Sequence, residues 1–276
     1  MSYPLIIEPD QLEPLRHNDD IVIVDLSQPG QYVNAHIPEA HYLPYGTITR
    51  ARPPIVGLLP DAAVFSRILG NLGIDAGKHV VACDDEGGGC AARFIWTLHV
   101  FGHRNTSLLN GGIASWINEG HETSALPPLN PVPTDYSLTP TDSDIADYDY
   151  IRQHLDDDRV ALLDARSEGE YRGSKKLADK AGHIPGAKHF EWTEAMDRQR
   201  NFRLLPAGQI ETRLQSLGLN RNREIICYCQ SHHRSAYTWL VLKALGYENV
   251  RGYPGSWSDW GNRADAPVET DTPAVA

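Results

Sequence analysis

Residues 224–247 combine, in order, an apolar strand pattern, a cysteine, a short polar loop and an amphipathic helix pattern. The run EIICY is typical of a buried strand, and apolar residues at helical spacing follow Ser235, which we expect to cap the helix. Cys229 is therefore expected at a strand end, facing a helix start. Loop amides and the helix dipole favour an anion there, so a cysteine can ionise near neutral pH. With Arg234 close by, Cys229 is predicted to be a nucleophile.

The distribution of charge points to the same segment. The chain of 276 residues has a formal net charge of −11, which argues against nucleic acid or an anionic membrane as a partner. Residues 225–245 nevertheless contain no Asp or Glu, whereas Arg234, Lys243, His232 and His233 all lie there. On an acidic protein, this local reversal favours the approach of an anionic substrate.

The composition is that of a soluble globular protein, because 41% of the residues are hydrophobic and 22% are charged. No segment resembles an uncharged apolar stretch able to span a bilayer. The N-terminal segment has neither the basic start nor the long apolar run of a secretory signal. All four cysteines lie in enzyme-like segments. We therefore expect the protein in a reducing cytoplasm.

The two halves of the chain repeat each other. Matching residues occur in the same order in both halves, which indicates a duplicated unit. The matched pairs include Asp25 with Asp164, Tyr32 with Tyr171, His36 with His183, Gly111 with Gly255 and Trp116 with Trp260. Because the two histidines recur in both halves, we expect them to have a structural role.

Each half alternates short apolar runs with helical patterns, which is the signature of a parallel sheet with helices outside. The fold class is therefore predicted to be α/β, with two tandem domains, each a small parallel sheet flanked by helices. We assign residues 1–125 to the first domain and 135–276 to the second, catalytic domain. Residues 126–134 form a proline-rich linker, because their prolines exclude regular helix or central strand.

The first half does not repeat the chemistry of the second. Gly111 and Gly255, like Trp116 and Trp260, are 144 residues apart, and this spacing pairs Cys229 with Asp85 and Arg234 with Cys90. The acidic side chains of the loop from residue 84 to residue 89 would repel an anion. The first domain is therefore predicted to be inactive.

Four motifs carry a resemblance to a known family. They are the Asp-x-Arg start at Asp164–Arg166, GHIPGA at 182–187, CQSHHR at 229–234 and GSWSDWG at 255–261. With these motifs, the chain resembles the two-domain rhodaneses, the thiosulfate sulfurtransferases of the bacterial type, over nearly its whole length. The resemblance implies tandem rhodanese folds with an inactive first domain and a catalytic cysteine in the second.

The resemblance also implies the reaction. Cys229 would attack the outer sulfur of thiosulfate or a related anionic donor, release sulfite and hold the sulfur as a persulfide, which cyanide or a thiol then removes by ping-pong kinetics. Arg234 would bind the sulfonate end of the donor, and no metal or organic cofactor is expected. The other expected substrate contacts are Gln230, Ser231, His232 and His233, with Asp164, Arg166 and Ser235 as structural support.

The chain departs from the mammalian rhodanese pattern at two positions, because that pattern has basic residues where this chain has Ser231 and Glu170. The loop also departs from the Cys-Gly-Ser-Gly pattern of the mercaptopyruvate sulfurtransferases. Thiosulfate is therefore the expected donor, with 3-mercaptopyruvate as an alternative.

A second alternative is an enzyme like the tyrosine phosphatases or arsenate reductases, whose loops resemble C-x5-R. Only four residues separate Cys229 from Arg234, and this shorter loop favours transfer of a sulfur atom over binding of phosphate. A zinc site formed by Cys227, Cys229, His232 and His233 is disfavoured, since the spacing of the two cysteines is too short.

A third alternative is a persulfide carrier that delivers sulfur to a protein partner. An exposed Cys229 and an acidic surface would be compatible with such docking. The expected small-molecule partners are an anionic sulfur donor and a thiol or cyanide acceptor. We expect a monomer, since the two halves can cover each other's exposed faces.

Overall fold

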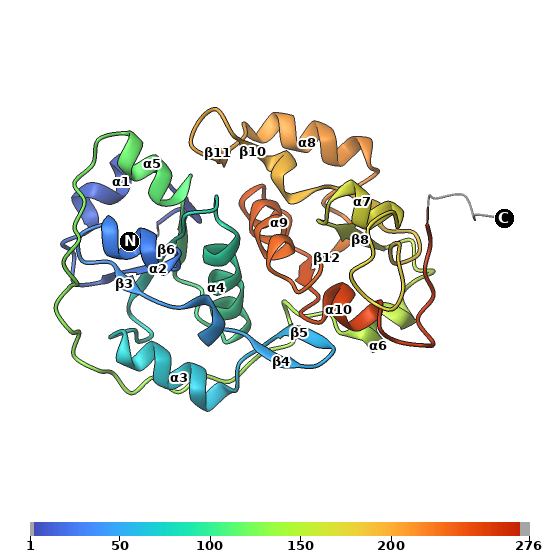
Figure 1. The fold of residues 1–276 in the computed structure, drawn as a ribbon, viewed down its shortest axis with the longest axis horizontal. Coiled ribbons are helices and arrows are strands. Elements are labelled where there is room, and N and C mark those ends of the chain that lie inside the picture. The colour runs from blue at the N-terminus through green and yellow to red at the C-terminus, as the bar shows by residue number, and fades with distance from the viewer. Residues whose placement is uncertain (1–2, 271–276) are drawn as a thin grey trace. The chain divides into compact units, whose positions relative to one another are not determined.

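The computed structural model describes residues 3–270 (Figure 1). The chain divides into two compact units, and each contains a short hairpin from the other half of the sequence. The first unit comprises the residues up to Ile48, Leu59–Thr141 and Met196–Leu204. The second unit comprises Thr49–Leu58, Asp142–Ala195 and the residues from Leu205 onward. A division at residues 126–134 alone would assign both hairpins to the opposite unit.

The first unit contains a five-stranded parallel sheet in the order β1-β7-β6-β2-β3. The central strands β2 (Ile21–Asp25) and β6 (His79–Cys83) are buried along their whole length, as expected for strands covered on both faces. The other strands are β1 (Ile6–Ile7), β3 (His41–Tyr42) and β7 (Thr106–Leu109), with the antiparallel pair β10 (Met196–Asp197) and β11 (Arg203–Leu204).

Helices surround this sheet and close its core. The helices are α1 (Pro9–Leu12), α2 (Pro29–Asn34), α3 (Ala62–Asn71), α4 (Gly89–Val100) and α5 (Gly112–Asn118), with 3-10 turns η1 (Glu13–Leu15) and η2 (Tyr45–Thr47). One core cluster includes Ile23, Ile37, Val81, Leu109 and Trp116.

The second unit contains a four-stranded parallel sheet in the order β13-β12-β8-β9. Its strands are β8 (Val160–Asp164), β9 (Lys188–His189), β12 (Glu224–Tyr228) and β13 (Val250–Gly252). Its helices are α6 (Tyr148–Gln153), α7 (Glu168–Arg172), α8 (Ala207–Ser216), α9 (Arg234–Ala244) and α10 (Ser256–Trp260), with the 3-10 turn η3 (Trp192–Ala195). The antiparallel pair β4 (Arg50–Arg52) and β5 (Ile55–Leu58) completes this unit.

The predicted fold class is confirmed, since both units are parallel sheets flanked by helices. The duplicated residues play the same part in each unit. The ring of Tyr32 stacks on His36 with 4.0 Å between ring centroids, and Tyr171 stacks on His183 with 3.8 Å. Each histidine Nδ1 also lies within hydrogen-bond distance of the carbonyl of its stacked tyrosine, at 2.6 and 2.8 Å. These histidines hold the turns together in both units.

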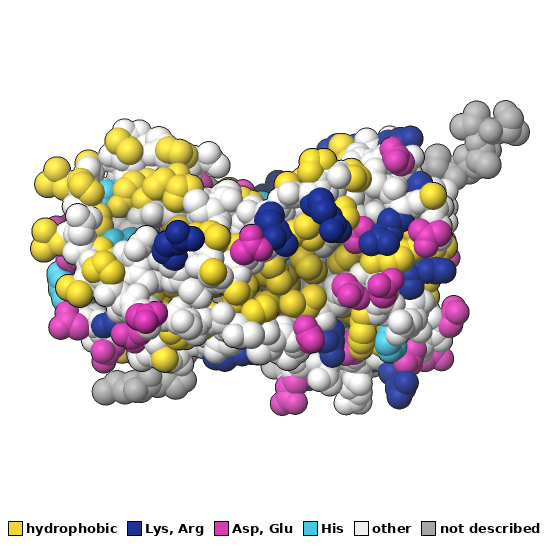
Figure 2. Space-filling model, turned by 90° about the horizontal axis from the view of Figure 1, so that it is seen from below, with side chains coloured by type: hydrophobic (Ala, Val, Ile, Leu, Met, Phe, Trp, Pro, Cys, Tyr) yellow, Lys and Arg dark blue, Asp and Glu magenta, His cyan; other side chains and the backbone are white. Residues whose placement is uncertain are grey.

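Acidic and basic side chains are interspersed on the face drawn in Figure 2, rather than gathered into one large patch of a single sign. Within residues 3–270, no helix is both long enough and apolar enough to cross a bilayer.

Candidate active site

Cys229 directly follows β12, at the carboxyl end of the parallel sheet in the second unit. Ligands of open α/β sheets gather at this end of the strands. The backbone of Cys229 is held from two sides by the start of α10. Its N–H donates to Ser256 Oγ at 3.2 Å, and its carbonyl accepts from the Trp257 N–H at 2.9 Å. The residue is 1% exposed, so the thiol sits in a fixed, buried position.

The surroundings of Cys229 favour the thiolate. Burial alone would raise the pKa of the thiol, because a buried charge loses its hydration. The positive charge of Arg234, hydrogen bonds from the hydroxyl and amide of Ser235, and the Ser231 amide act in the opposite direction. Together they hold the pKa of Cys229 below the ordinary thiol value. The site can therefore stabilise a negatively charged sulfur away from bulk water.

Arg234 forms a bidentate ion pair with a carboxylate that lies 64 residues earlier in the sequence. Its two Nη atoms donate to the two carboxylate oxygens of Glu170, at 2.8 and 2.9 Å. The Glu170 side chain is 2% exposed and the Arg234 side chain 21%. Burial opposes ionisation of Glu170, but Arg234 and Ser167 outweigh it and lower the pKa of Glu170 to about 2. The guanidinium is thus fixed in place, and part of its charge is balanced.

Glu170 is itself positioned by the first turn of α7. One of its carboxylate oxygens accepts from the Ser167 hydroxyl at 2.7 Å and from the Ser167 N–H at 3.2 Å, which completes a capping box. The start of α7 therefore sets the position of the carboxylate that holds Arg234.

A second buried ion pair supports the strand ends. Arg166 donates to both carboxylate oxygens of Asp164 at 2.6–3.0 Å and to the carbonyl of Gly182 at 2.7 Å. Both side chains are at most 1% exposed. The guanidinium carbon of Arg166 lies 4.4 Å from the ring centroid of Trp257. The backbone N–H of the same tryptophan donates to the Cys229 carbonyl. Asp164 and Arg166 thus tie β8 to the GHIPGA segment and to α10.

The helix after the loop begins at Arg234 with His233 as its N-cap, so the prediction that Ser235 caps it is wrong. Ser235 lies in the first turn of α9, and its hydroxyl contacts the loop rather than capping the helix. The Ser235 Oγ lies 2.8 Å from His232 Nδ1. The same hydroxyl also favours the Cys229 thiolate, so Ser235 links His232 to the sulfur. His232 is fully buried at a φ of 55°, so it supports the loop from within.

The remaining loop residues are partly exposed. The side-chain amide of Gln230 donates to the carbonyl of Leu177 at 3.2 Å. The ring centroids of His233 and Trp192 lie 5.9 Å apart, and the ring of Trp192 also makes an edge contact with Tyr237. Gln230 and His233 therefore connect the loop to neighbouring segments of the second unit.

In the first unit, Asp84 stands where Cys229 stands in the second. The register of β2 with β6 pairs Asp25 with Cys83, and that of β8 with β12 pairs Asp164 with Tyr228. The residue that follows each inner strand is therefore Asp84 in one unit and Cys229 in the other. The sequence-based match with Asp85 is one residue too far along, because the spacing between the repeats changes after these strands.

The same shift places Gly89, rather than Cys90, at the position of Arg234, since these two residues begin α4 and α9. The first unit thus has neither a nucleophile nor a cation at these two positions. Its loop has a different anion in the same place.

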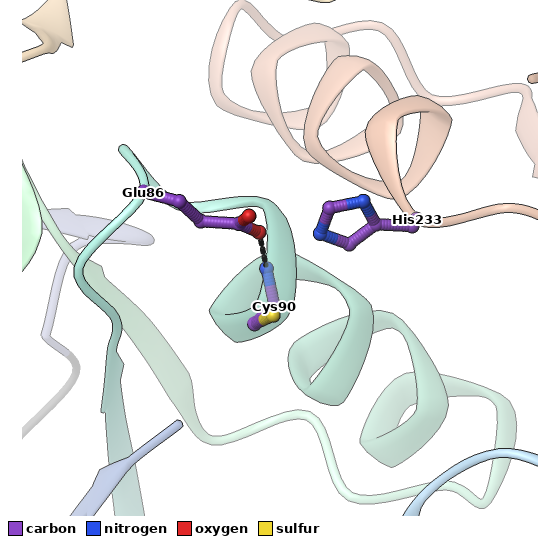
Figure 3. A group of neighbouring side chains, drawn as sticks. All are labelled: Glu86, Cys90 and His233. Carbon is purple, nitrogen blue, oxygen red and sulfur yellow. Dashed lines mark hydrogen bonds between the residues drawn. The ribbon is translucent and has the colours of Figure 1, made fainter. Parts of the chain in front are cut away.

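The buried Asp84 carboxylate fills the loop of the first unit. It accepts backbone N–H groups from Glu86 at 3.1 Å, Gly88 at 2.7 Å and Ala91 at 2.9 Å. Figure 3 shows the next contact of this turn, in which the Glu86 carboxylate accepts from the Cys90 N–H at 3.0 Å. Burial and the charge of Glu86 raise the pKa of Asp84. The loop geometry shared by the repeats is therefore an anion cradle, filled by a carboxylate in one copy and a thiol in the other.

The four residues weighed, and disfavoured, as a zinc site do not lie together in the structure. Within the described residues 3–270, no three of Cys227, Cys229, His232 and His233 bring their ligand atoms within 4.8 Å of one another. Cys227 is fully buried in β12, and burial raises the pKa of its thiol. The exposed Cys229 supposed for a carrier protein is also wrong, since the residue is 1% exposed.

The sequence did not reveal the roles of Glu170 and Ser256. Glu170 is an acidic residue at a position that is basic in the mammalian rhodanese pattern. This difference is the sequence feature that could have indicated an ion pair with Arg234. Ser256 lies inside the GSWSDWG motif, but the backbone of Cys229 reaches it only through the fold.

We expect alkylation of Cys229 by iodoacetamide to titrate with an apparent pKa below the ordinary thiol value of about 8.5. The rate should rise with pH as the thiolate forms and level off above that pKa. Burial raises the pKa of Cys83, Cys90 and Cys227, so these thiols should react later. Peptide mass spectrometry after alkylation across a pH series measures all four. A Cys229 pKa above the ordinary value would contradict the described electrostatics.

Comparison with known proteins shows the family to which the chain belongs. The model of the rhodanese-like domain matches residues 8–119 and again residues 147–263. A thiosulfate sulfurtransferase of Pseudomonas aeruginosa is 43% identical over 96% of this chain and 97% of its own length. One from Azotobacter vinelandii is 42% identical over 97% of this chain and 98% of its own. The sulfur carrier protein TtuD of Thermus thermophilus is 30% identical over 95% of this chain and 92% of its own.

Solved structures show the same fold at lower identity. The crystal structure of YnjE superimposes with a TM-score of 0.87 at 19% identity and covers 96% of this chain and 68% of that chain. The chain belongs to the rhodanese family, with two rhodanese-like domains in tandem. It is a rhodanese-type sulfurtransferase, and the family predicted from the four sequence motifs is confirmed.

Proposed function

We propose that the protein transfers sulfane sulfur from thiosulfate to cyanide or a thiol through a persulfide on Cys229. The observation that carries this proposal is the buried cysteine whose pKa is lowered by Arg234, Ser235 and the Ser231 amide, even though its burial acts the other way. Such a thiolate is a nucleophile at neutral pH. The two relatives at 42–43% identity, which are named thiosulfate sulfurtransferases, support thiosulfate as the donor.

In the first half-reaction, the Cys229 thiolate attacks the outer sulfur of thiosulfate. A sulfur–sulfur bond to Cys229 forms while the bond within thiosulfate breaks, and sulfite leaves with the electron pair. The terminal persulfide sulfur carries the negative charge. Because the donors around Cys229 already stabilise an anion, they can stabilise this charge without rearranging.

In the second half-reaction, cyanide or a thiolate attacks the terminal sulfur of the persulfide. The bond to Cys229 breaks, and the cysteine recovers its electron pair as a thiolate. Cyanide leaves as thiocyanate. No oxidant, metal or organic cofactor is needed to balance either step, so we propose that the enzyme uses none.

Arg234 has two roles in this proposal. Its charge favours the thiolate, and each Nη has a second N–H beyond the one given to Glu170. These hydrogens and Nε are the groups proposed to bind the sulfonate end of the donor. Since Glu170 balances part of the charge, binding of the dianionic donor is expected to be weaker than at an unpaired arginine.

The test is to mix the enzyme with excess thiosulfate in the absence of an acceptor and to measure sulfite. We expect a burst of about one sulfite per active site, followed by little further release until cyanide is added. Initial rates at several fixed thiosulfate concentrations should give parallel double-reciprocal lines against cyanide. Sulfite release only in the presence of an acceptor would overturn the persulfide pathway.

A protein acceptor is the second candidate, favoured by the 30% identity to a sulfur carrier protein over nearly the full length. The interspersed surface charges are compatible with docking of a small protein (Figure 2). Transfer of labelled sulfur to a candidate protein thiol faster than turnover with cyanide would favour this role.

We also propose that the protein is a cytoplasmic monomer. Cys83, Cys90, Cys227 and Cys229 are all free thiols, which is compatible with a reducing compartment. Light scattering during gel filtration tests the oligomeric state.

A further inference from the structure

The loop that carries Cys229 is backed by a hairpin from the first half of the sequence. This hairpin comprises β4 and β5, and it belongs to the second unit. Figure 1 shows it in light blue beside α10, the helix that holds the backbone of Cys229. It lies about 170 residues before the nucleophile in the sequence, and none of the four family motifs includes it.

One contact joins the hairpin to α10 through Ser258. The Val56 N–H donates to Ser258 Oγ at 3.0 Å, and the Val56 carbonyl lies 3.2 Å from the same hydroxyl. The backbone N–H of Ser258 donates in turn to the carbonyl of Gln230 at 3.0 Å. Ser258 therefore connects the hairpin, the helix and the residue that follows Cys229.

A second contact joins the hairpin directly to the loop. Gly57 has a φ of +81° and lies against the backbone of Ser231. A methyl group on Gly57 would lie 2.7 Å from the carbonyl carbon of Ser231 and closer still to its oxygen. That is too near for any side chain, so the loop would have to move. Only glycine allows the hairpin and the loop to approach this closely.

Ser231 is the residue at which this contact matters for chemistry. Its amide is one of the donors that favour the Cys229 thiolate. A shift of the Ser231 backbone away from residue 57 would turn this N–H relative to the sulfur. The hairpin thus limits the positions that an anion-stabilising group can take.

We infer that the β4–β5 hairpin is a positioning element for the Cys229 loop, with Gly57 and Ser258 as the positioning residues. The first half of the chain has Asp84 at the position of Cys229, yet it contributes to catalysis through the ten residues Thr49–Leu58. The inference rests on the proposed role of Cys229 as the nucleophile and adds a second determinant of its reactivity.

The test compares Gly57→Ala with Gly218→Ala. Gly218 follows α8 in the same unit, has a φ of +76° and has no atom within 4 Å of an added methyl group. Both variants therefore place an alanine in the left-handed backbone region, with similar strain. Only in Gly57→Ala does the added methyl group clash with the loop that carries Cys229. We expect Gly57→Ala to lower kcat/KM for thiosulfate by roughly 100-fold, since small displacements at a reacting centre have effects of that order. Gly218→Ala should keep nearly full activity.

The pH profile of Cys229 alkylation distinguishes a positioning role from a purely structural role, because loss of structure elsewhere in the unit would not shift the pKa of Cys229. We expect Gly57→Ala to shift the apparent pKa of Cys229 upward while circular dichroism stays native. Ser258→Ala, which removes the Val56 contact without adding bulk, should shift it in the same direction by a smaller amount. This second variant tests the inference even if Gly57→Ala does not fold.

Unchanged alkylation profiles and rates in both Gly57→Ala and Ser258→Ala would overturn the inference. A wild-type enzyme that takes up no sulfur from thiosulfate would instead contradict the proposed function. Because alkylation needs no sulfur donor, the two failures can be told apart.

Discussion

Replacement of Cys229 by serine is expected to lower kcat/KM for thiosulfate and cyanide by at least about 10⁴-fold, because covalent transfer ends when the nucleophile is lost. The serine hydroxyl fits the same space and can accept the same amide hydrogens, so the protein should remain folded. The high pKa of the serine hydroxyl leaves almost no alkoxide at neutral pH. Thiocyanate formation and circular dichroism, measured on the same preparation, separate loss of chemistry from loss of structure.

Cys227→Ala is the matched control, since this cysteine is two residues away and fully buried in β12. We expect it to retain most of the activity and to lose on the order of 1 kcal/mol of stability through the lost packing. Equal losses of activity in Cys229→Ser and Cys227→Ala would show that the site tolerates no change in this strand, and would not identify a nucleophile. Substantial turnover by Cys229→Ser would contradict the account.

Arg234→Gln is expected to have the second largest effect, because it acts on both activity and stability. It removes the cation that favours the thiolate, so the pKa of Cys229 should rise and kcat/KM should fall by about 100-fold or more. It also leaves the Glu170 carboxylate buried without its partner, which costs on the order of 3–5 kcal/mol of unfolding free energy. Alkylation kinetics and urea unfolding measure the two effects separately.

The Arg234→Gln, Glu170→Gln double variant separates the two roles of the pair. A glutamine at position 170 can keep the capping contact with Ser167, and no buried charge remains. We therefore expect most of the stability to return while activity stays low. If the double variant were as active as the wild type, the charge of Arg234 would not be required for catalysis.

The Glu170 ion pair should also appear in the pH dependence of stability. The pKa of Glu170 is lowered to about 2 in the folded protein, against about 4.3 in an unfolded chain. A depressed carboxyl pKa contributes stability above the unfolded value, and this contribution is lost as pH falls from about 4.3 toward 2. Comparison of acid unfolding in the wild type and in the double variant tests this, because the variant should lose less stability over that range.

The local parts of the site could be predicted from the sequence. A buried strand, a polar loop and a helix are each encoded by neighbouring residues, so the position of Cys229 at a strand end follows from pattern alone. The ion pair of Asp164 with Arg166 could also be predicted, because the two residues are only two positions apart in the sequence. The repeat of Tyr32 and His36 in Tyr171 and His183 likewise indicated two copies of one fold.

The register between the two copies could not be read with the same accuracy. The spacing of 144 residues holds for the glycines and tryptophans at the end of each repeat. A difference of one residue between the strand and those positions moves the match of Cys229 from Asp85 to Asp84. Only the pairing of strands within each sheet settles this, and it reveals a carboxylate in the place of the thiol.

Contacts between distant segments account for the rest. Glu170 reaches Arg234 across 64 residues, and Val56 reaches Ser258 across 202. No periodicity or motif encodes such contacts, since they depend on how the elements pack. The same limit applies to the buried state of Cys229, because a polar loop in a sequence suggests exposure.

The most direct test is the intact mass of the purified protein before thiosulfate, after thiosulfate and again after cyanide. We predict a gain of one sulfur, about 32 Da, that cyanide removes and that maps to the peptide containing Cys229. Cys229→Ser should show no gain under the same conditions. A wild-type mass that never changes, or an added sulfur on Cys83, Cys90 or Cys227, would contradict covalent sulfur transfer at Cys229.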